Sequence, residues 1–212
     1  MKESTKKIYE DLFVRYPPLK GVKDNIFNAF GRMKETLGKG GTIFCCGNGG
    51  SASDCEHIVG ELLKSFRKRR PVDPETASRL SSFGKEGEYL LSRLEGALPA
   101  VSLISQTGIM TAFANDRSWD AAIAQQLYGL GRKGDCLLLL STSGNSANCV
   151  YAALVAKAKG ISTVAFSGED GGKLKKICDE SVCVPERETF RVQELHLPVY
   201  HCLCAMLEDT FF

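Results

Sequence analysis

Two segments of the chain share one pattern, in which a short apolar run enters a loop of small polar residues and leaves it as a helical pattern. The first is GGTIFCCGNGGS followed by CEHIVGELLKSF, and the second is GDCLLLLSTSGNSANCVYAALVAKAKG. An apolar run that ends in a cluster of Gly, Ser and Asn predicts a strand and a loop, and apolar residues three or four positions apart predict a helix. Two such strand–loop–helix units indicate a single sheet.

The rest of the chain continues this alternation. Further short strands are expected at residues 100–104, 162–166 and 180–184, with helical stretches between them. Two segments before the first unit, residues 5–14 and 22–37, have helical spacing on either side of YPPLKG and predict a helical pair within residues 1–38. We therefore expect an α/β fold, doubly wound, with a mainly parallel sheet covered by helices on both faces.

The length favours one domain over residues 1–212, since 212 residues with 43% hydrophobic content can bury one substantial core. Residues 69–99 interrupt the rhythm, and their Asp73-Pro74 turn signal and charged amphipathic repeats predict an inserted helical hairpin. Whether this hairpin is a lid or a decoration stays open. The basic run at residues 67–70 is interpreted as a solvated surface, with attraction of a phosphorylated substrate as the alternative.

Composition excludes several classes of partner. Twenty-seven basic and 25 acidic side chains leave a formal charge of +2, which does not argue for nucleic acid or a membrane surface. The first residues, MKESTKKIYEDLF, have no apolar stretch after their lysines, and no window approaches eighteen uninterrupted apolar residues. The nine cysteines lie mostly inside apolar runs, as reduced core residues do, and their spacing does not match a thiolate zinc framework. A cytoplasmic protein is expected.

The loop of the second unit is a candidate phosphate site. It places four hydroxyls within six residues, and Gly144 allows the backbone to approach an anion closely. The four are Ser141, Thr142, Ser143 and Ser146. A helix N-terminus beyond a parallel strand offers free backbone N–H groups to such a ligand. The alternative is simple helix capping, which needs only one hydroxyl. The loop matches neither a Walker A sequence nor a GxGxxG fingerprint, which argues against a nucleotide.

The first loop and the histidines supply the other candidates. Asn48, Gly49, Gly50 and Ser51 offer a glycine-lined backbone and polar side chains to sugar hydroxyls, although a tight turn explains these glycines equally well. His57 and Glu61 are four residues apart on the following helix and therefore share a face. The other two histidines, His196 and His201, follow Gln193 on a late predicted helix. Taken alone, His57 is more often a surface or core residue than a ligand.

Four motifs together resemble the phosphoheptose isomerase branch of the sugar isomerase domain family. They are CGNGGSASDCEHIVGEL, STSGNSAN, AND and TFRVQELHLPVYH, and the resemblance covers most of the chain. It implies a homotetramer with active sites between subunits, which converts sedoheptulose 7-phosphate to a manno-heptose 7-phosphate, often with a bound zinc. The chain departs from the family pattern at Leu63-Lys64-Ser65-Phe66, where some relatives carry an arginine. Lys64 or Arg67 would have to replace that arginine.

The resemblance also assigns roles to residues of this chain. Glu61 and His201 would be the catalytic base and acid, because ketose–aldose exchange moves a proton between adjacent carbons through an enediol. His57, Glu61, Gln193 and His201 would hold the zinc. The substrate would contact Asn48, Gly49, Gly50, Ser51, Glu61, Asn115, Asp116, Ser141, Thr142, Ser143, Ser146 and Gln193.

One spacing conflicts with this zinc site. Gln193 and His201 lie about 12 Å apart on a regular helix, too far to share an ion directly. Either Pro198 interrupts the helix or a second subunit supplies a ligand.

Two other functions use the same fold. One is a tetrameric protein that binds a replication initiator, and the other is a module that senses sugar phosphates. Neither needs the acid–base residues, so Glu61 and His201 favour the enzyme. Hexose and pentose phosphates stay open as substrates, because the phosphate loop would recognise the end that they share.

Overall fold

The sheet has five parallel strands in the order β2-β1-β3-β4-β5, in a computed structural model that describes all 212 residues. The strands are β1 (Ile43–Gly47), β2 (Ala100–Ser102), β3 (Cys136–Leu140), β4 (Ser162–Ser167) and β5 (Glu180–Cys183). Every predicted strand is present, and the predicted α/β, doubly wound class is confirmed. The central strands β1 and β3 are buried along their whole length, as their unbroken apolar runs require.

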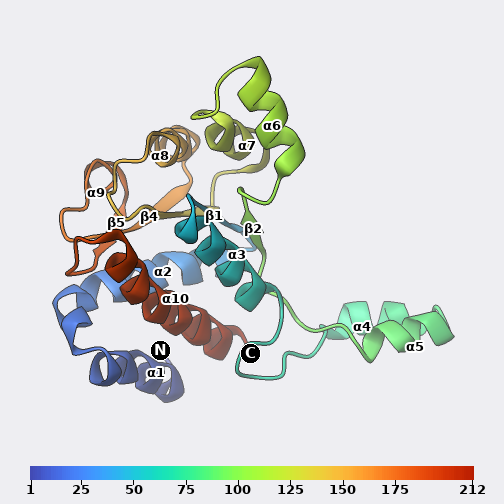
Figure 1. Ribbon diagram of the computed structural model, residues 1–212. Coiled ribbons are helices and arrows are strands. Elements are labelled where there is room, and N and C mark those ends of the chain that lie inside the picture. The colour runs from blue at the N-terminus through green and yellow to red at the C-terminus, as the bar shows by residue number, and fades with distance from the viewer.

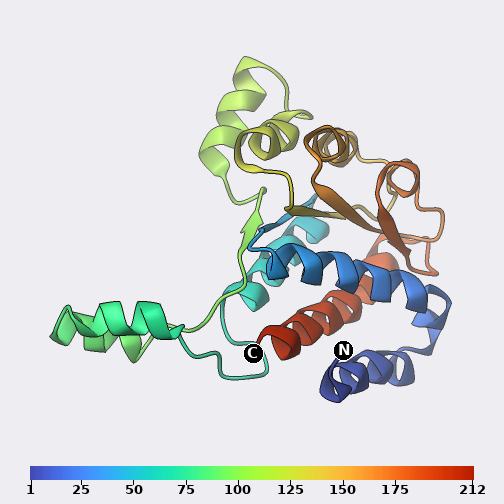
Figure 2. The same cartoon turned by 180° about the vertical axis from the view of Figure 1, so that it is seen from behind.

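Helices cover both faces of this sheet (Figures 1 and 2). One face carries α1 (Glu3–Arg15), a 3-10 helix (Pro17–Val22), α2 (Lys23–Gly38), α3 (Gly50–Leu63) and α10 (Thr189–Phe211). The other carries α6 (Thr107–Asp116), α7 (Ala122–Leu130), α8 (Ala147–Lys159) and α9 (Leu174–Ile177). Alternate residues of β1 enter two separate apolar cores, Ile43 and Cys45 on the first face and Phe44 and Cys46 on the second. The predicted N-terminal helical pair is α1 and α2.

The strand order reverses between β1 and β3. The chain goes from β1 outward to β2, then returns to place β3 on the other side of β1, where Gly47 lies opposite Leu140. The loops after these two strands therefore lie next to each other at the carboxyl edge of the sheet. Ligands of open α/β sheets bind at such a switch point.

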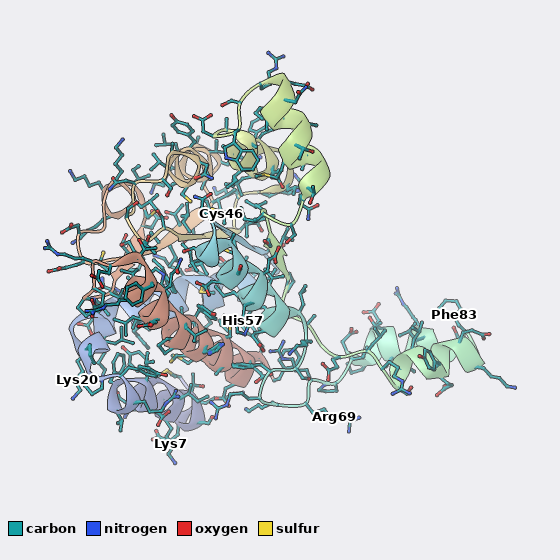
Figure 3. The ribbon with its side chains drawn as sticks, in the orientation of Figure 1. Lys7, Lys20, Cys46, His57, Arg69 and Phe83 are labelled. Carbon is teal, nitrogen blue, oxygen red and sulfur yellow. The ribbon has the colours of Figure 1, made fainter.

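The inserted hairpin projects from the body as an arm (Figure 1). Its helices α4 (Pro74–Ser81) and α5 (Lys85–Leu91) make their extensive contacts only with each other, and Phe83 lies at the far tip (Figure 3). Asp73 caps α4 by accepting a hydrogen bond from the backbone N–H of Thr76, as its sequence signal predicts. The predicted helical insertion is confirmed.

The interpretation of the basic run at residues 67–70 as a solvated surface is wrong for Arg70. Its side chain is fully buried at the root of the arm, and its Nε donates to Glu208 Oε1 at 2.8 Å. The rest of its guanidinium donates to the carbonyl oxygens of Leu62 and Glu61 at the end of α3. The partner carboxylate lies 138 positions away in the sequence, so the local run of charges did not reveal it.

All nine cysteines are free and seven of them are buried, which confirms reduced core residues. None of the helices combines the length and the apolar character needed to cross a membrane. The helix α10 passes through Pro198 without interruption, so the idea that Pro198 breaks it is wrong.

Candidate active site

The hydroxyl loop joins β3 to α8 and is held in shape by its own hydrogen bonds. Ser141 is buried and its Oγ donates to Ser146 Oγ at 3.1 Å, while Ser143 Oγ accepts from the backbone N–H of Asn145 at 3.1 Å. Ser146 occupies the N-cap position of α8 but makes no side-chain capping bond. The alternative of Ser143 serving only the backbone therefore keeps support from its bond to Asn145, but no hydroxyl caps α8, whose start keeps N–H groups for an anion.

Gly144 lets this loop lie against the neighbouring one. Its φ is +62°, and a Cβ added there would stand 2.1 Å from the carbonyl oxygen of Gly171. Any other residue would force the two backbones apart and strain the left-handed conformation.

The glycine loop after β1 is tied to the first turn of α8. The side-chain amides of Asn48 and Asn148 donate to each other's carbonyl oxygens at 3.0 and 2.7 Å. Ser51 is buried at the start of α3, and Gln193 Nε2 lies within 3.4 Å of its Oγ. A Cβ on Gly50 would meet the amide of Gln193 at 2.8 Å. Gln193 thus covers this loop, at the junction with the hydroxyl loop.

A second group of polar side chains lies between α3 and α10, around His57 (Figure 3). His57 Nε2 is 3.3 Å from Glu61 Oε1 and 3.3 Å from His201 Nε2. The Glu61 side chain is only 12% exposed, and its other oxygen, Oε2, is buried without a hydrogen-bond partner. The ammonium of Lys64 forms an ion pair with that oxygen at 3.6 Å, beyond hydrogen-bond distance.

The surroundings of the histidines set their charge and orientation. Burial, followed by the neighbouring His57, lowers the pKa of His201, which favours its neutral imidazole near pH 7. Tyr200 is buried, and its hydroxyl is 3.1 Å from both Asp54 Oδ1 and His57 Nδ1. Burial and the nearby Asp54 raise the pKa of Tyr200, so the phenol keeps its proton.

Asp54 and Tyr200 are not among the site residues predicted from the sequence. Asp54 is three positions before His57 on the same helix, a spacing that could have pointed to it.

The predicted site residues form two groups within one chain. Gly50 and Glu61 are eleven residues apart on α3, or about 16 Å along the helix axis, so the two loops and the histidine cluster are separate. Gln193 lies with the loops, about 12 Å along the uninterrupted α10 from His201. Asn115 and Asp116 lie exposed at the end of α6, where they hydrogen-bond to each other at 2.8 Å and to neither loop.

The spacing of the donor atoms around His57 is close to that of zinc ligands. Zinc–nitrogen and zinc–oxygen distances of 2.0–2.1 Å place tetrahedral ligands about 3.3–3.4 Å apart. The two distances from His57 Nε2 agree with this spacing. No group of three or more His, Cys, Asp or Glu side chains is arranged to hold a metal ion. Two imidazoles and a carboxylate are a donor set that zinc takes, and Gln193 does not join them within the chain.

Comparison with known proteins identifies this architecture. The SIS domain family model matches residues 19–101 and 90–168. The phosphoheptose isomerase of Roseiflexus sp. (strain RS-1) is 37% identical over 181 residues, 85% of this chain and 79% of its own length. That of Halorhodospira halophila is 35% identical over 207 residues, 96% of this chain and 92% of its own.

Solved structures agree. The phosphoheptose isomerase of Neisseria gonorrhoeae, 30% identical, superposes with a TM-score of 0.71 over 97% of this chain and 92% of that one. The enzyme of Francisella tularensis is 27% identical, with a TM-score of 0.73 over 98% and 94% of the two chains. The sheet, the two loops and these matches define a protein of the SIS domain class. Within that class the chain belongs to the phosphoheptose isomerase family, and it is an isomerase.

Proposed function

We propose that this isomerase interconverts sedoheptulose 7-phosphate and D-glycero-D-manno-heptose 7-phosphate by proton transfer through an enediol. The observation that carries the proposal is the buried Oε2 of Glu61, which accepts no hydrogen bond and belongs to one cluster with His57 and His201. The hydroxyl loop at the switch point supports a phosphomonoester as the common end of the substrate. The family relatives carry the name phosphoheptose isomerase.

In this mechanism Glu61 removes a proton from C1 of the ketose while His201 donates a proton to the C2 oxygen, which gives the enediol. His201 then takes the proton of the C1 hydroxyl, and the Glu61 carboxylic acid returns its proton to C2, which gives the aldose. The lowered pKa of His201 suits this exchange, because a neutral imidazole can both donate and accept a proton between two oxygens. Both groups end in the state in which they began.

We also propose zinc as the cofactor, held by His57, Glu61 and His201, with Gln193 as the fourth expected ligand. When bound, zinc would polarise the carbonyl that is converted. The two oxygens of Glu61 allow both of its roles, since Oε1 faces His57 and Oε2 is free to act as the base. The 12 Å between Gln193 and His201 along α10 favours a contribution from a second subunit.

The assembly proposed is a homotetramer with active sites between subunits. An extended heptose 7-phosphate spans about 10 Å from C1 to phosphorus, at roughly 1.2 Å for each bond along the chain. The helical path from Gly50 to Glu61 is about 16 Å. This difference supports a site in which the loops of one subunit face the acid–base cluster of another. The exposed Asn115 and Asp116 would then contact substrate across the same boundary.

The proposed setting is the cytoplasm, in the synthesis of heptose precursors for surface polysaccharides such as lipopolysaccharide. Nine free cysteines support a reducing compartment.

The test is proton NMR of sedoheptulose 7-phosphate incubated in D2O with zinc-loaded protein. We expect aldose formation with deuterium uptake at the carbon that receives the proton, and its loss in Glu61→Gln. Glu56→Gln on the same helix is the matched control, because Glu56 is exposed and hydrogen-bonds only to Ser105. Ribulose 5-phosphate and fructose 6-phosphate in parallel tubes test the substrate. Turnover only of these sugars would reassign it, and no turnover of any would favour a binding role.

A further inference from the structure

Tyr200 joins two side chains of α3 that are one turn apart. Its hydroxyl lies 3.1 Å from Asp54 Oδ1 and 3.1 Å from His57 Nδ1. Tyr200 is 1% exposed, and its ring meets the imidazole of His57 edge-on with centroids 5.5 Å apart. The other nitrogen of that imidazole, Nε2, is the atom that faces Glu61 and His201. Each nitrogen of His57 therefore has its own set of neighbours.

The proton count decides the direction of these hydrogen bonds. A phenol has one proton to donate, and an ionised carboxylate can only accept. If Tyr200 donated to His57 Nδ1, the partly buried Asp54 would have no donor, because it makes no other hydrogen bond. If Tyr200 donates to Asp54, its oxygen accepts a proton from His57 Nδ1 and all three groups are satisfied. The second arrangement avoids an unpaired carboxylate, which costs more than a lost neutral hydrogen bond.

We propose that Asp54 and Tyr200 form a hydrogen-bond relay that fixes His57 as the Nδ1–H tautomer and leaves the Nε2 lone pair free for the active site. Tyr200 is a positioning residue, since it contacts His57 and not the reacting atoms. The inference deepens the proposed function, because that function uses His57 Nε2 as a zinc ligand. A ligating histidine needs a partner for its other nitrogen, and loss of such partners typically weakens metal binding about 10–100-fold.

The relay also explains why the cluster of His57, Glu61 and His201 favours a bound cation. With Nδ1 protonated, the bare Nε2 of neutral His57 faces the Glu61 carboxylate oxygen at 3.3 Å. Two lone pairs at this distance repel, a cost that the two hydrogen bonds of the relay offset in the metal-free protein and that a metal ion would remove. Zinc would supply that positive charge without reversing the tautomer.

The chain provides an internal reference in His196. Its Nε2 lies 3.3 Å from the carbonyl oxygen of Ser167, which can only accept, so His196 carries its proton on Nε2. Burial lowers the pKa of His196 to about 4, so it is neutral at any pH above about 6. The two histidines are therefore expected to be opposite tautomers in one spectrum.

The experiment is nitrogen-15 solid-state NMR of chelator-treated protein labelled at histidine, at about pH 8. Only three histidines are present, and His57→Gln assigns the signals of His57 by their disappearance. We expect a protonated Nδ1 and an unprotonated Nε2 for His57, opposite to His196. Tyr200→Phe should move His57 toward a mixture of tautomers, and Asp54→Ala should move it to Nε2–H, since the phenol then donates to Nδ1.

The matched control is Tyr128→Phe, which removes an exposed hydroxyl that makes no side-chain hydrogen bond. Zinc affinity, measured by chelator competition, should fall about 10–100-fold in Tyr200→Phe and stay unchanged in Tyr128→Phe. Wild-type His57 as the Nε2–H tautomer, or a His57 signal unaltered by Tyr200→Phe, would overturn the relay. The tautomer readout needs no turnover, so a protein that shows it without isomerising a sugar contradicts the proposed function alone.

Discussion

The buried ion pair at the root of the arm leads to a large expected effect. Arg70→Met would leave Glu208 in place, 1% exposed, with backbone N–H groups of Phe66 and Arg67 as donors but without its cation. The same change removes the guanidinium donors from the carbonyls of Glu61 and Leu62. Breaking a buried pair by removing one partner typically costs about 3–5 kcal/mol. We expect a loss of this size in the free energy of unfolding.

The assay is urea unfolding at one fixed protomer concentration, because assembly would contribute to the measured stability. With an m-value of about 3 kcal/mol/M for a chain of this size, the midpoint should fall by roughly 1–2 M. Arg69→Met is the matched control, since Arg69 is exposed one position away and should change the stability by less than about 0.5 kcal/mol. Equal midpoints for the two variants would refute the reasoning.

A double variant separates the two causes. Arg70→Met with Glu208→Gln removes the unpaired buried charge but keeps an oxygen that can accept from the backbone N–H groups. Part of the lost stability should return, because a neutral amide is cheaper to bury than an unpaired carboxylate. A double variant no more stable than Arg70→Met would place the effect in the lost bonds to the end of α3.

Three further predictions concern other parts of the chain. Burial alone would raise the pKa of Asp209, but hydrogen bonds from Lys68 and two hydroxyls lower it to about 2. This carboxylate therefore contributes on the order of 2 kcal/mol above about pH 4, a contribution lost as the pH falls from about 4 to 2, and Asp209→Asn should flatten the acid limb of stability against pH. Gly144→Ala, placed against Gly171, should weaken binding of phosphate or sugar phosphate in calorimetry more than it lowers the melting temperature. Replacing residues 73–93 by a short Gly-Ser linker should change the melting temperature little, since α4 and α5 pack mainly on each other.

Most of the fold could be predicted because its signals are local. The strand β3 begins and ends where the apolar run Cys136–Leu140 does, and the glycine and hydroxyl loops follow β1 and β3 as expected. A doubly wound sheet was predictable from the alternation of strands and helices alone. Its switch point followed once the order of the strands was known.

The failures of prediction have a common physical cause in long-range contacts. The burial of Arg70 depends on Glu208, and no local pattern links them. Pro198 lies inside α10 without breaking it, because the packing of this buried segment outweighs the loss of one backbone hydrogen bond. Tyr200 was not a candidate, since a tyrosine next to a histidine says nothing about the helix that it faces.

The face of α10 that meets α3 connects these contacts. Gln193 covers the glycine loop, Tyr200 orients His57, and Glu208 holds Arg70 beyond the end of α3. These three residues are spaced by seven and eight positions, about two helical turns, so they lie on one side of α10. Both helices run in the same direction, so a single alignment of α10 along α3 forms all three contacts. A shift of α10 at Glu208 would therefore also move Tyr200 against His57, and Arg70→Met should disturb the His57 tautomer although Arg70 touches no imidazole.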